Sequence, residues 1–259
     1  MANFPAFIAA ACGGLFLGML VLIEIGRRLG VRRLIADPDG ARAGTGAVEG
    51  AVFALFGLLI AFTFSGAASR FDDRQHLVAE EVNDIGTAWL RIGLLPTHAQ
   101  PPLRDLFRRY VDSRLDTYRK LPDIDASKAE YVRSIALQQE IWSQAVDAAR
   151  DSGSQPAHML LLPALNAMID ITTTRVMTAQ MHPPPIVFVM LAALALTGAM
   201  LVGYGMAGGK VRNWLHSVGF AAVIAVTVYV IFDIEYPRLG LIRVDAADQV
   251  LVELRGSME

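Results

Sequence analysis

The sequence predicts an all-α, multi-pass membrane protein with four transmembrane helices, a helical domain inserted between spans two and three, and a second span that continues as a long helix. Two observations support this prediction. Hydrophobic residues make up 54% of the 259 residues and charged residues only 19%, whereas soluble domains average about 45–50% apolar and about 25% charged residues. The apolar residues are also clustered in stretches that are long enough to cross a membrane.

Four apolar stretches have the length of a transmembrane helix, which needs roughly 20 residues to cross a hydrocarbon core about 30 Å thick. The predicted spans are 4–25, 47–67, 185–206 and 215–234. They divide the chain into a membrane segment 1–67 with an arginine-rich loop, a helical extramembrane domain 68–184, a second membrane segment 185–235 and a C-terminal tail 236–259.

The short loops between spans predict the orientation, because cytoplasmic loops carry an excess of lysine and arginine. The basic residues of these loops are Arg27, Arg28, Arg32, Arg33 and Arg42 after the first span, and Lys210 and Arg212 after the third. Both loops lie on the same side of the membrane. We therefore expect the N-terminus, the helical domain and the C-terminus to be extracytoplasmic.

The first helix predicted in the central segment has one apolar face. Apolar residues between 103 and 118 recur at spacings of three and four, which is typical of an amphipathic helix. The opposite face predicts three ion pairs between residues four positions apart: Arg108–Asp112, Asp105–Arg109 and Asp116–Lys120.

Two more helices are predicted in the same segment. The first runs over about 126–150, with Asp125 or Ser127 as the candidate N-cap residue. The second runs over 157–180 and ends at a run of prolines before the third span.

The stretch 57–91 passes from apolar to charged residues without a proline or a turn signal, so it predicts one unbroken helix. Its apolar half carries a small-residue row at helical spacing: Gly57, Ala61, Ser65 and Ser69. Small residues let helices approach closely in lipid, either within one subunit or between subunits. Beside them lies a second row, the neck row: Phe56, Ile60 and Phe64. These side chains could face lipid or form a hydrophobic constriction of a pore.

The charged half of this stretch supplies candidate pore-mouth charges: Arg70, Asp72, Asp73, Arg74 and Glu80, with Glu81 beside them. Asp72, His76 and Glu80 share one helical face and could bind a divalent cation. An ion-paired or solvated strip is the preferred interpretation, because metal sites usually draw ligands from more than one element. For the acids at the span ends, including Asp233 and Glu235, a functional role and ordinary solvation both stay open.

No motif for a catalytic nucleophile, a metal site, a phosphate loop or a dinucleotide is present. We therefore expect no catalytic residues, no metal, no cofactor and no enzymatic activity. The net charge of −2 gives no reason to expect binding to nucleic acid.

Three stretches of the sequence are distinctive: "GLLIAFTFSGAASRFDDRQHLVAEEVNDIGTAWLRIGLLP" at 57–96, "LNAMIDITTTRVMTAQMHPPPIVFV" at 165–189 and "DIEYPRLGLIRV" at 233–244. In order and spacing they resemble the signatures of a bacterial family of four-span membrane proteins described as bestrophin-like. The signature positions are Asn166, Asp170, Arg175, Pro183, Pro184, Asp233, Glu235, Pro237, Arg238 and Gly240. The resemblance to bestrophins implies pentamers with a central ion pathway, which is lined by the second span and narrowed by bulky apolar residues spaced like the neck row.

The expected function is an oligomeric ion channel or pore in the bacterial inner membrane, with lipids and copies of the same chain as partners. The resemblance to bestrophins implies that the oligomer is a pentamer. The alternative is a non-enzymatic scaffold or sensor whose helical domain binds a partner or ligand. The sequence does not predict the permeant ion or the gating stimulus.

Overall fold

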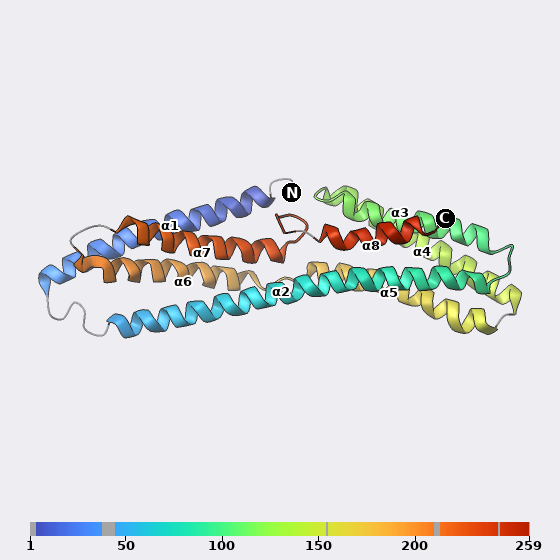
Figure 1. Cartoon of the computed structure of the whole chain (residues 1–259), viewed down its shortest axis with the longest axis horizontal. Coiled ribbons are helices and arrows are strands. Elements are labelled where there is room, and N and C mark those ends of the chain that lie inside the picture. The colour runs from blue at the N-terminus through green and yellow to red at the C-terminus, as the bar shows by residue number, and fades with distance from the viewer. Residues whose placement is uncertain (1–3, 38–44, 154, 210–212, 243, 259) are drawn as a thin grey trace. The chain divides into compact units, whose positions relative to one another are not determined.

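The computed structural model of the chain describes residues 4–37, 45–153, 155–209, 213–242 and 244–258 (Figure 1). The α-helices are α1 (Phe4–Ala36), α2 (Thr45–Arg91), α3 (Gln100–Arg119), α4 (Ile124–Ser152), α5 (Leu162–Gln180), α6 (Pro185–Gly205), α7 (Trp214–Glu235) and α8 (Asp245–Gly256). The 3₁₀ turns η1 (Ile92–Leu94) and η3 (Met206–Gly208) and the π-helical turn η2 (Ala157–Leu161) complete the set. No strand occurs within these ranges, so the predicted all-α class is confirmed.

Four helical stretches of the described chain are long and apolar enough to cross a membrane, and they contain α1, α2, α6 and α7. The prediction of four transmembrane helices is therefore confirmed. α2 is a single helix of 47 residues, which also confirms that the apolar and charged halves of 57–91 are continuous. Its length follows from the absence of proline, since only a breaker or a competing cap would end it locally.

The first part of the loop predicted after the first span is helical. α1 extends to Ala36, so it carries four of the arginines that were expected in a loop. Glu24 forms ion pairs with Arg27 at 3.2 Å and with Arg28 at 2.7 Å. The remaining basic residues of the two loops, Arg42, Lys210 and Arg212, lie outside the described residues.

The chain forms two compact units. The membrane unit consists of Asn3–Ser69 and His182–Tyr236, and the helical unit consists of Arg70–Met181 and Pro237–Glu259. The C-terminal tail is thus part of the helical unit, where α8 packs on α3.

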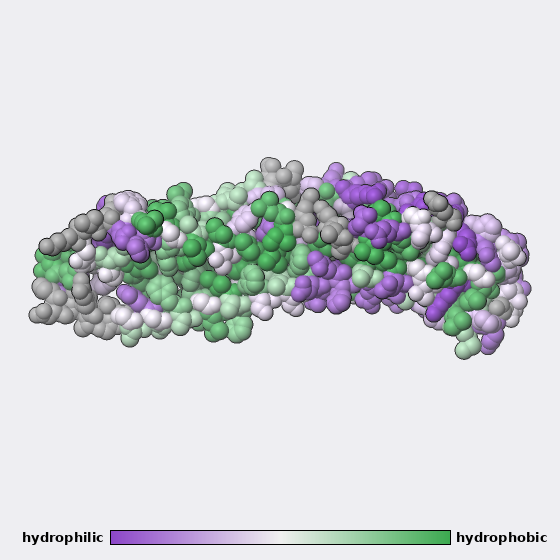
Figure 2. Space-filling model, in the orientation of Figure 1, coloured by the Kyte–Doolittle hydropathy of each residue, from purple (hydrophilic) through white to green (hydrophobic). Residues whose placement is uncertain are grey.

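In the membrane unit α1 packs along α6 and α7 (Figure 1). Met19, Leu191 and Ala221 are fully or almost fully buried in the apolar cluster between these helices. The outward surface is apolar as well, as the green surface over this unit in Figure 2 shows. Its exposed side chains include Phe7, Leu17, Val21, Leu58, Phe62, Ile186, Val189 and Val223. A unit that is apolar both inside and outside is suited to lipid, since water would drive such a surface to aggregate.

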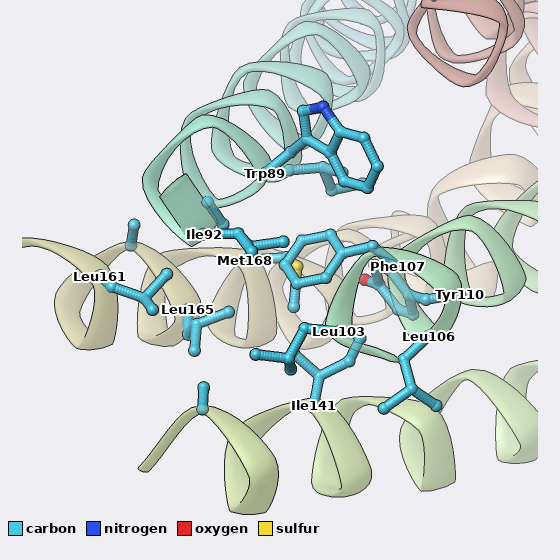
Figure 3. Packing of buried hydrophobic residues seen from close by; sticks show 14 of the residues in the cluster. Trp89, Ile92, Leu103, Leu106, Phe107, Tyr110, Ile141, Leu161, Leu165 and Met168 are labelled. Carbon is cyan, nitrogen blue, oxygen red and sulfur yellow. The ribbon is translucent and has the colours of Figure 1, made fainter. Parts of the chain in front are cut away.

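The helical unit has an ordinary hydrophobic core, formed by the second half of α2 with α3, α4, α5 and α8. Figure 3 shows Trp89, Phe107, Ile141 and Met168 converging from four of these helices. The apolar stripe predicted on α3 forms part of this core, because its residues at spacings of three and four share one face.

One buried polar bridge joins three helices of this unit. The Gln138 side-chain amide on α4 donates hydrogen bonds to Tyr110 Oη on α3 at 3.0 Å and to Thr172 Oγ1 on α5 at 2.8 Å. Burial raises the pKa of Tyr110, so its hydroxyl stays neutral at physiological pH. A neutral, satisfied network of this kind fixes the register of the helices without burying a charge.

The ends of α4 correct one prediction. The N-cap residue is Asp123, whose carboxylate accepts a hydrogen bond from the Ala126 amide at 3.1 Å, and neither Asp125 nor Ser127 caps the helix. The helix therefore begins two residues earlier than predicted. It ends at Gly153, whose φ of +59° suits a glycine in the left-handed region.

Two of the three ion pairs expected along α3, Arg108–Asp112 and Asp116–Lys120, are replaced by contacts with other parts of the helical unit. Asp112 pairs with Arg255 of α8 at 2.7 Å, and Arg108 donates to the Met258 carbonyl at 2.6 Å. Lys120 pairs with Glu130 of α4 at 2.7 Å. Neighbouring helices supply better-placed partners than the flexible pairs within one exposed helix, which contribute only about 0.2–0.5 kcal/mol each.

Candidate functional site

The neck row lies on the apolar half of α2 and is buried unevenly. Phe56 is only 5% exposed, because it packs into the apolar cluster of its own unit. Ile60 lies at the edge of that cluster, and Phe64 is 44% exposed. Of the three neck-row side chains, Phe64 therefore offers the most exposed surface.

The small-residue row faces away from the rest of its unit. Gly57, Ala61, Ser65 and Ser69 are all exposed. A Cβ atom built on Gly57 would meet nothing within 4 Å. α2 contacts its unit instead through large side chains, such as Phe53, whose ring lies 6.0 Å from that of Phe220 on α7. The small residues of α2 are thus not used for close packing within the chain.

Close packing within the chain occurs between α1 and α6, at glycines that the sequence analysis did not single out. A Cβ on Gly26 would overlap the Met200 carbonyl oxygen, and a Cβ on Gly203 would overlap the Ile23 carbonyl oxygen. Gly30 is in similarly close contact with Tyr204. The signal was present in the sequence as Gly26-x-x-x-Gly30, a spacing typical of closely packed membrane helices.

The candidate pore-mouth charges lie on α2 at the start of the helical unit. Asp72, Asp73 and Glu80 are exposed, as is His76. Arg74 donates a hydrogen bond to the Met181 carbonyl at 3.1 Å. Across the described ranges, no group of three or more His, Cys, Asp or Glu side chains could hold a metal ion.

Glu81 is not a pore-mouth charge, which corrects the expectation for this residue. It is fully buried in the helical unit, where its carboxylate pairs with Arg114 of α3 at 2.6 Å and with Arg175 of α5. Arg114 is itself 1% exposed and Arg175 is 8% exposed. One carboxylate therefore compensates two buried arginines and ties three helices together.

Tyr118 connects this buried network to a third arginine. The guanidinium groups of Arg114, Arg175 and Arg238 lie 5.2, 4.4 and 4.4 Å from the centroid of its ring. Arg238 also forms a two-pronged ion pair with Asp248 of α8, at 2.6 and 3.0 Å. We call Arg114, Arg175 and Arg238 the arginine cluster.

The charges of the cluster influence one another. Burial, with a further contribution from Arg238, lowers the pKa of Arg175 to about 9, so the group remains protonated at neutral pH. Burial raises the pKa of Tyr118, against the opposing effect of Arg114 and Arg238. In Arg114, Nε donates a hydrogen bond to Glu81 and Nη2 donates one to Tyr118 Oη, whereas Nη1 has no hydrogen-bond partner among the described residues. The cluster therefore brings three guanidinium groups together around the ring of Tyr118.

The other signature positions have different surroundings. Asn166 and Asp170 are exposed on α5. Pro183 and Pro184 lead into α6, which begins at Pro185. The Pro237 carbonyl accepts a hydrogen bond from the Val244 amide at 3.3 Å, which closes a turn that contains Gly240.

Asp233 and Glu235 are buried at the C-terminal end of α7. Of the two interpretations left open for these acids, ordinary solvation is therefore wrong. His182 Nδ1 lies 2.9 Å from Glu235 Oε1, which is a hydrogen-bond distance, and the His182 ring stacks on Tyr236 at 4.4 Å. This contact links the second signature stretch, just before α6, to the third signature stretch at the end of α7, within the membrane unit.

These features define a four-span helical membrane protein with a helical unit of its own. The sequence matches the Bestrophin-like domain over residues 11–248, and the chain therefore belongs to the bestrophin-like family. No curated protein matches the chain in sequence.

Solved structures of similar fold include those of a bacterial bestrophin homologue from Klebsiella pneumoniae. One variant of that homologue is 14% identical with a TM-score of 0.69, covering 94% of this chain and 98% of the other. The structure solved by zinc phasing is 13% identical with a TM-score of 0.66, covering 92% and 97%. At these identities the likeness concerns the fold.

Proposed function

We propose that this protein is the subunit of an oligomeric ion channel or pore in the bacterial inner membrane, with α2 lining the pathway. The observation that carries the proposal is the exposed small-residue row of α2, which has no close partner inside the subunit. In lipid, where helix association depends on close packing, such a row favours contact with another helix. A second copy of the chain can supply this other helix, and in a symmetric oligomer every copy then has the same partner.

Membership of the bestrophin-like family supports the assembly, because bestrophins are pentamers around a central ion pathway. We propose that the exposed end of the neck row narrows this pathway, with Phe64 contributing the most exposed side chain while Phe56 packs within its own unit. The exposed Asp72, Asp73 and Glu80, with Arg70 and Arg74 beside them, would then set the charge at one mouth.

The arginines at the C-terminal end of α1 support the proposed orientation. Arg27, Arg28, Arg32 and Arg33 follow the apolar part of the helix directly. The positive-inside rule then places this end in the cytoplasm, with the helical unit and both termini outside it.

Ion flux into liposomes is the experiment that tests the proposed function. The purified protein is expected to form an oligomer with an axial hole in particle images and to pass ions when reconstituted. A monomeric particle would overturn the proposal. A stable oligomer that passes no ions and purifies with a stoichiometric partner would instead favour a scaffold or sensor.

Replacing Gly57 with leucine is expected to abolish the oligomer while leaving the subunit folded, because the added side chain would fill the surface on which a second subunit packs. Particle mass in detergent and helicity measure the two effects. Gly219→Leu on α7 is the matched control, since Gly219 is also exposed with nothing within 4 Å of a Cβ. Equal loss of assembly in both variants would contradict the assignment to α2.

Phe64→Ala is expected to raise single-channel conductance severalfold, because a smaller apolar side chain widens a constriction and eases its wetting. Phe62→Ala is the control, since Phe62 is 67% exposed but lies on a different face of α2. Planar-bilayer recording compares the two variants. An unchanged conductance for Phe64→Ala would remove this residue from the neck.

A further inference from the structure

A cavity of about 330 Å³ lies in the helical unit beside the arginine cluster. Its walls come from the C-terminal end of α3 and the residues after it, from α8, and from the turn that carries Arg238. The polar walls are Tyr118, Arg119, Arg238, Asp248 and Gln249, and the apolar walls are Leu115, Leu121 and Val252. A volume near the lower end of the range of about 300–1,000 Å³ suits a small ligand.

Positive charge predominates in and behind this cavity. Arg119 and Arg238 line it, and Arg114 and Arg175 lie against the Tyr118 ring. Asp248 is the acidic residue in the wall of this cavity, and the buried Glu81 pairs with Arg114 and Arg175. A cavity with low-dielectric walls concentrates such a field and attracts anions.

The geometry of Arg238 shows which kind of anion would fit. Its guanidinium carbon lies over the Tyr118 ring, 4.4 Å from the centroid, and the group donates two hydrogen bonds to the two oxygens of Asp248. This fork matches a carboxylate or a phosphate, which both offer a pair of oxygens at the right spacing. The carboxylate of Asp248, only 18% exposed, already occupies the position that such a ligand would take.

We propose that this cavity binds a small organic anion with a carboxylate or phosphate group, which Arg238 and Arg119 hold after displacing Asp248. The Gln249 side chain adds a hydrogen-bonding amide, and Leu115, Leu121 and Val252 surround the carbon skeleton. Asp248 acts as an internal competitor: it compensates Arg238 when the site is empty and lowers the affinity for the ligand. The proposal concerns binding in the helical unit and is independent of ion flux.

Calorimetric titration of the full-length protein in detergent tests the site, with succinate and inorganic phosphate as separate probes at constant chloride. At least one probe is expected to bind saturably, and the two arms distinguish a carboxylate ligand from a phosphate ligand. Saturable binding of neither probe would overturn the proposal.

Two variants with opposite expected effects test the role of each group. Arg238→Gln should weaken binding about tenfold or more, because a charged hydrogen-bond donor is lost. Asp248→Asn should tighten it, because the competing charge is removed. Weaker binding by Asp248→Asn would overturn the proposal, since it would show that the site prefers cations or depends on the ion pair for its shape.

Arg109→Gln is the control for surface charge. Arg109 is exposed on α3, the helix whose C-terminal end forms one wall of the cavity, but Arg109 itself does not line the cavity. It should leave binding unchanged, and an equal loss in this variant would contradict a built site. If Arg238→Gln does not fold, Arg238→Lys keeps the charge and removes the fork. It should still bind several times more weakly than the parent, and unchanged affinity would overturn the assigned geometry.

Discussion

Replacing Glu81 with glutamine is expected to destabilise the helical unit by about 3–5 kcal/mol, because two buried arginines would lose their common counter-charge. Glu81 is fully buried, and its two partners come from different helices. Thermal unfolding of the purified protein in detergent measures the effect. For a chain of this size the midpoint should fall by roughly 6–20 °C.

The adjacent residue provides the matched control. Glu80→Gln makes the same chemical change at an exposed position of the same helix, and it should alter stability by no more than about 0.5 kcal/mol. Replacing Glu81, Arg114 and Arg175 together with methionine should recover much of the loss, because no buried charge is then left without a partner. Similar unfolding midpoints for Glu80→Gln and Glu81→Gln would contradict the assigned network.

The second large effect is expected at Gly203, where alanine should destabilise the membrane unit by about 3 kcal/mol, the upper part of the range for overpacking. The added methyl group would overlap the carbonyl oxygen of Ile23 on α1. A backbone oxygen cannot rotate away as a side chain can, so α1 and α6 must move apart. The yield of folded protein and the unfolding midpoint in detergent measure the loss.

Gly57→Ala is the control for Gly203→Ala, since it adds the same methyl group to a membrane helix at a position with nothing within 4 Å. The folded subunit should tolerate this change. Gly26→Ala should behave like Gly203→Ala, because its methyl group would overlap the Met200 carbonyl on the same pair of helices. Normal stability in both Gly26→Ala and Gly203→Ala would show that the two helices do not approach closely.

The membrane helices and the length of α2 could be predicted because they depend on local properties of the chain. A run of about 20 apolar residues must satisfy its backbone groups internally in lipid, and a helix does so without any partner. The unbroken course of α2 follows similarly from the absence of proline and turn residues. Neither feature requires knowledge of which helices meet.

The ends and pairings of the helices were predicted less well, because several chemically suitable residues compete for each role. Asp123, Asp125 and Ser127 are all acceptable caps, and in the structure Asp123 caps the helix. Asp112 could pair along α3, but α8 brings Arg255 to it. The position of α8 is not encoded within α3, so no local pattern could reveal that pair.

The sequence by itself determined an all-helical membrane protein with four spans and a long α2 that carries a small-residue row. Only the tertiary structure decided that Glu81 is buried while Glu80 is exposed, and that Arg238 lies over Tyr118 beside a cavity. Neighbouring residues on a helix point about 100° apart, so two identical side chains can have opposite environments. Which of them is buried depends on where the other helices pack, and distant parts of the chain set that packing.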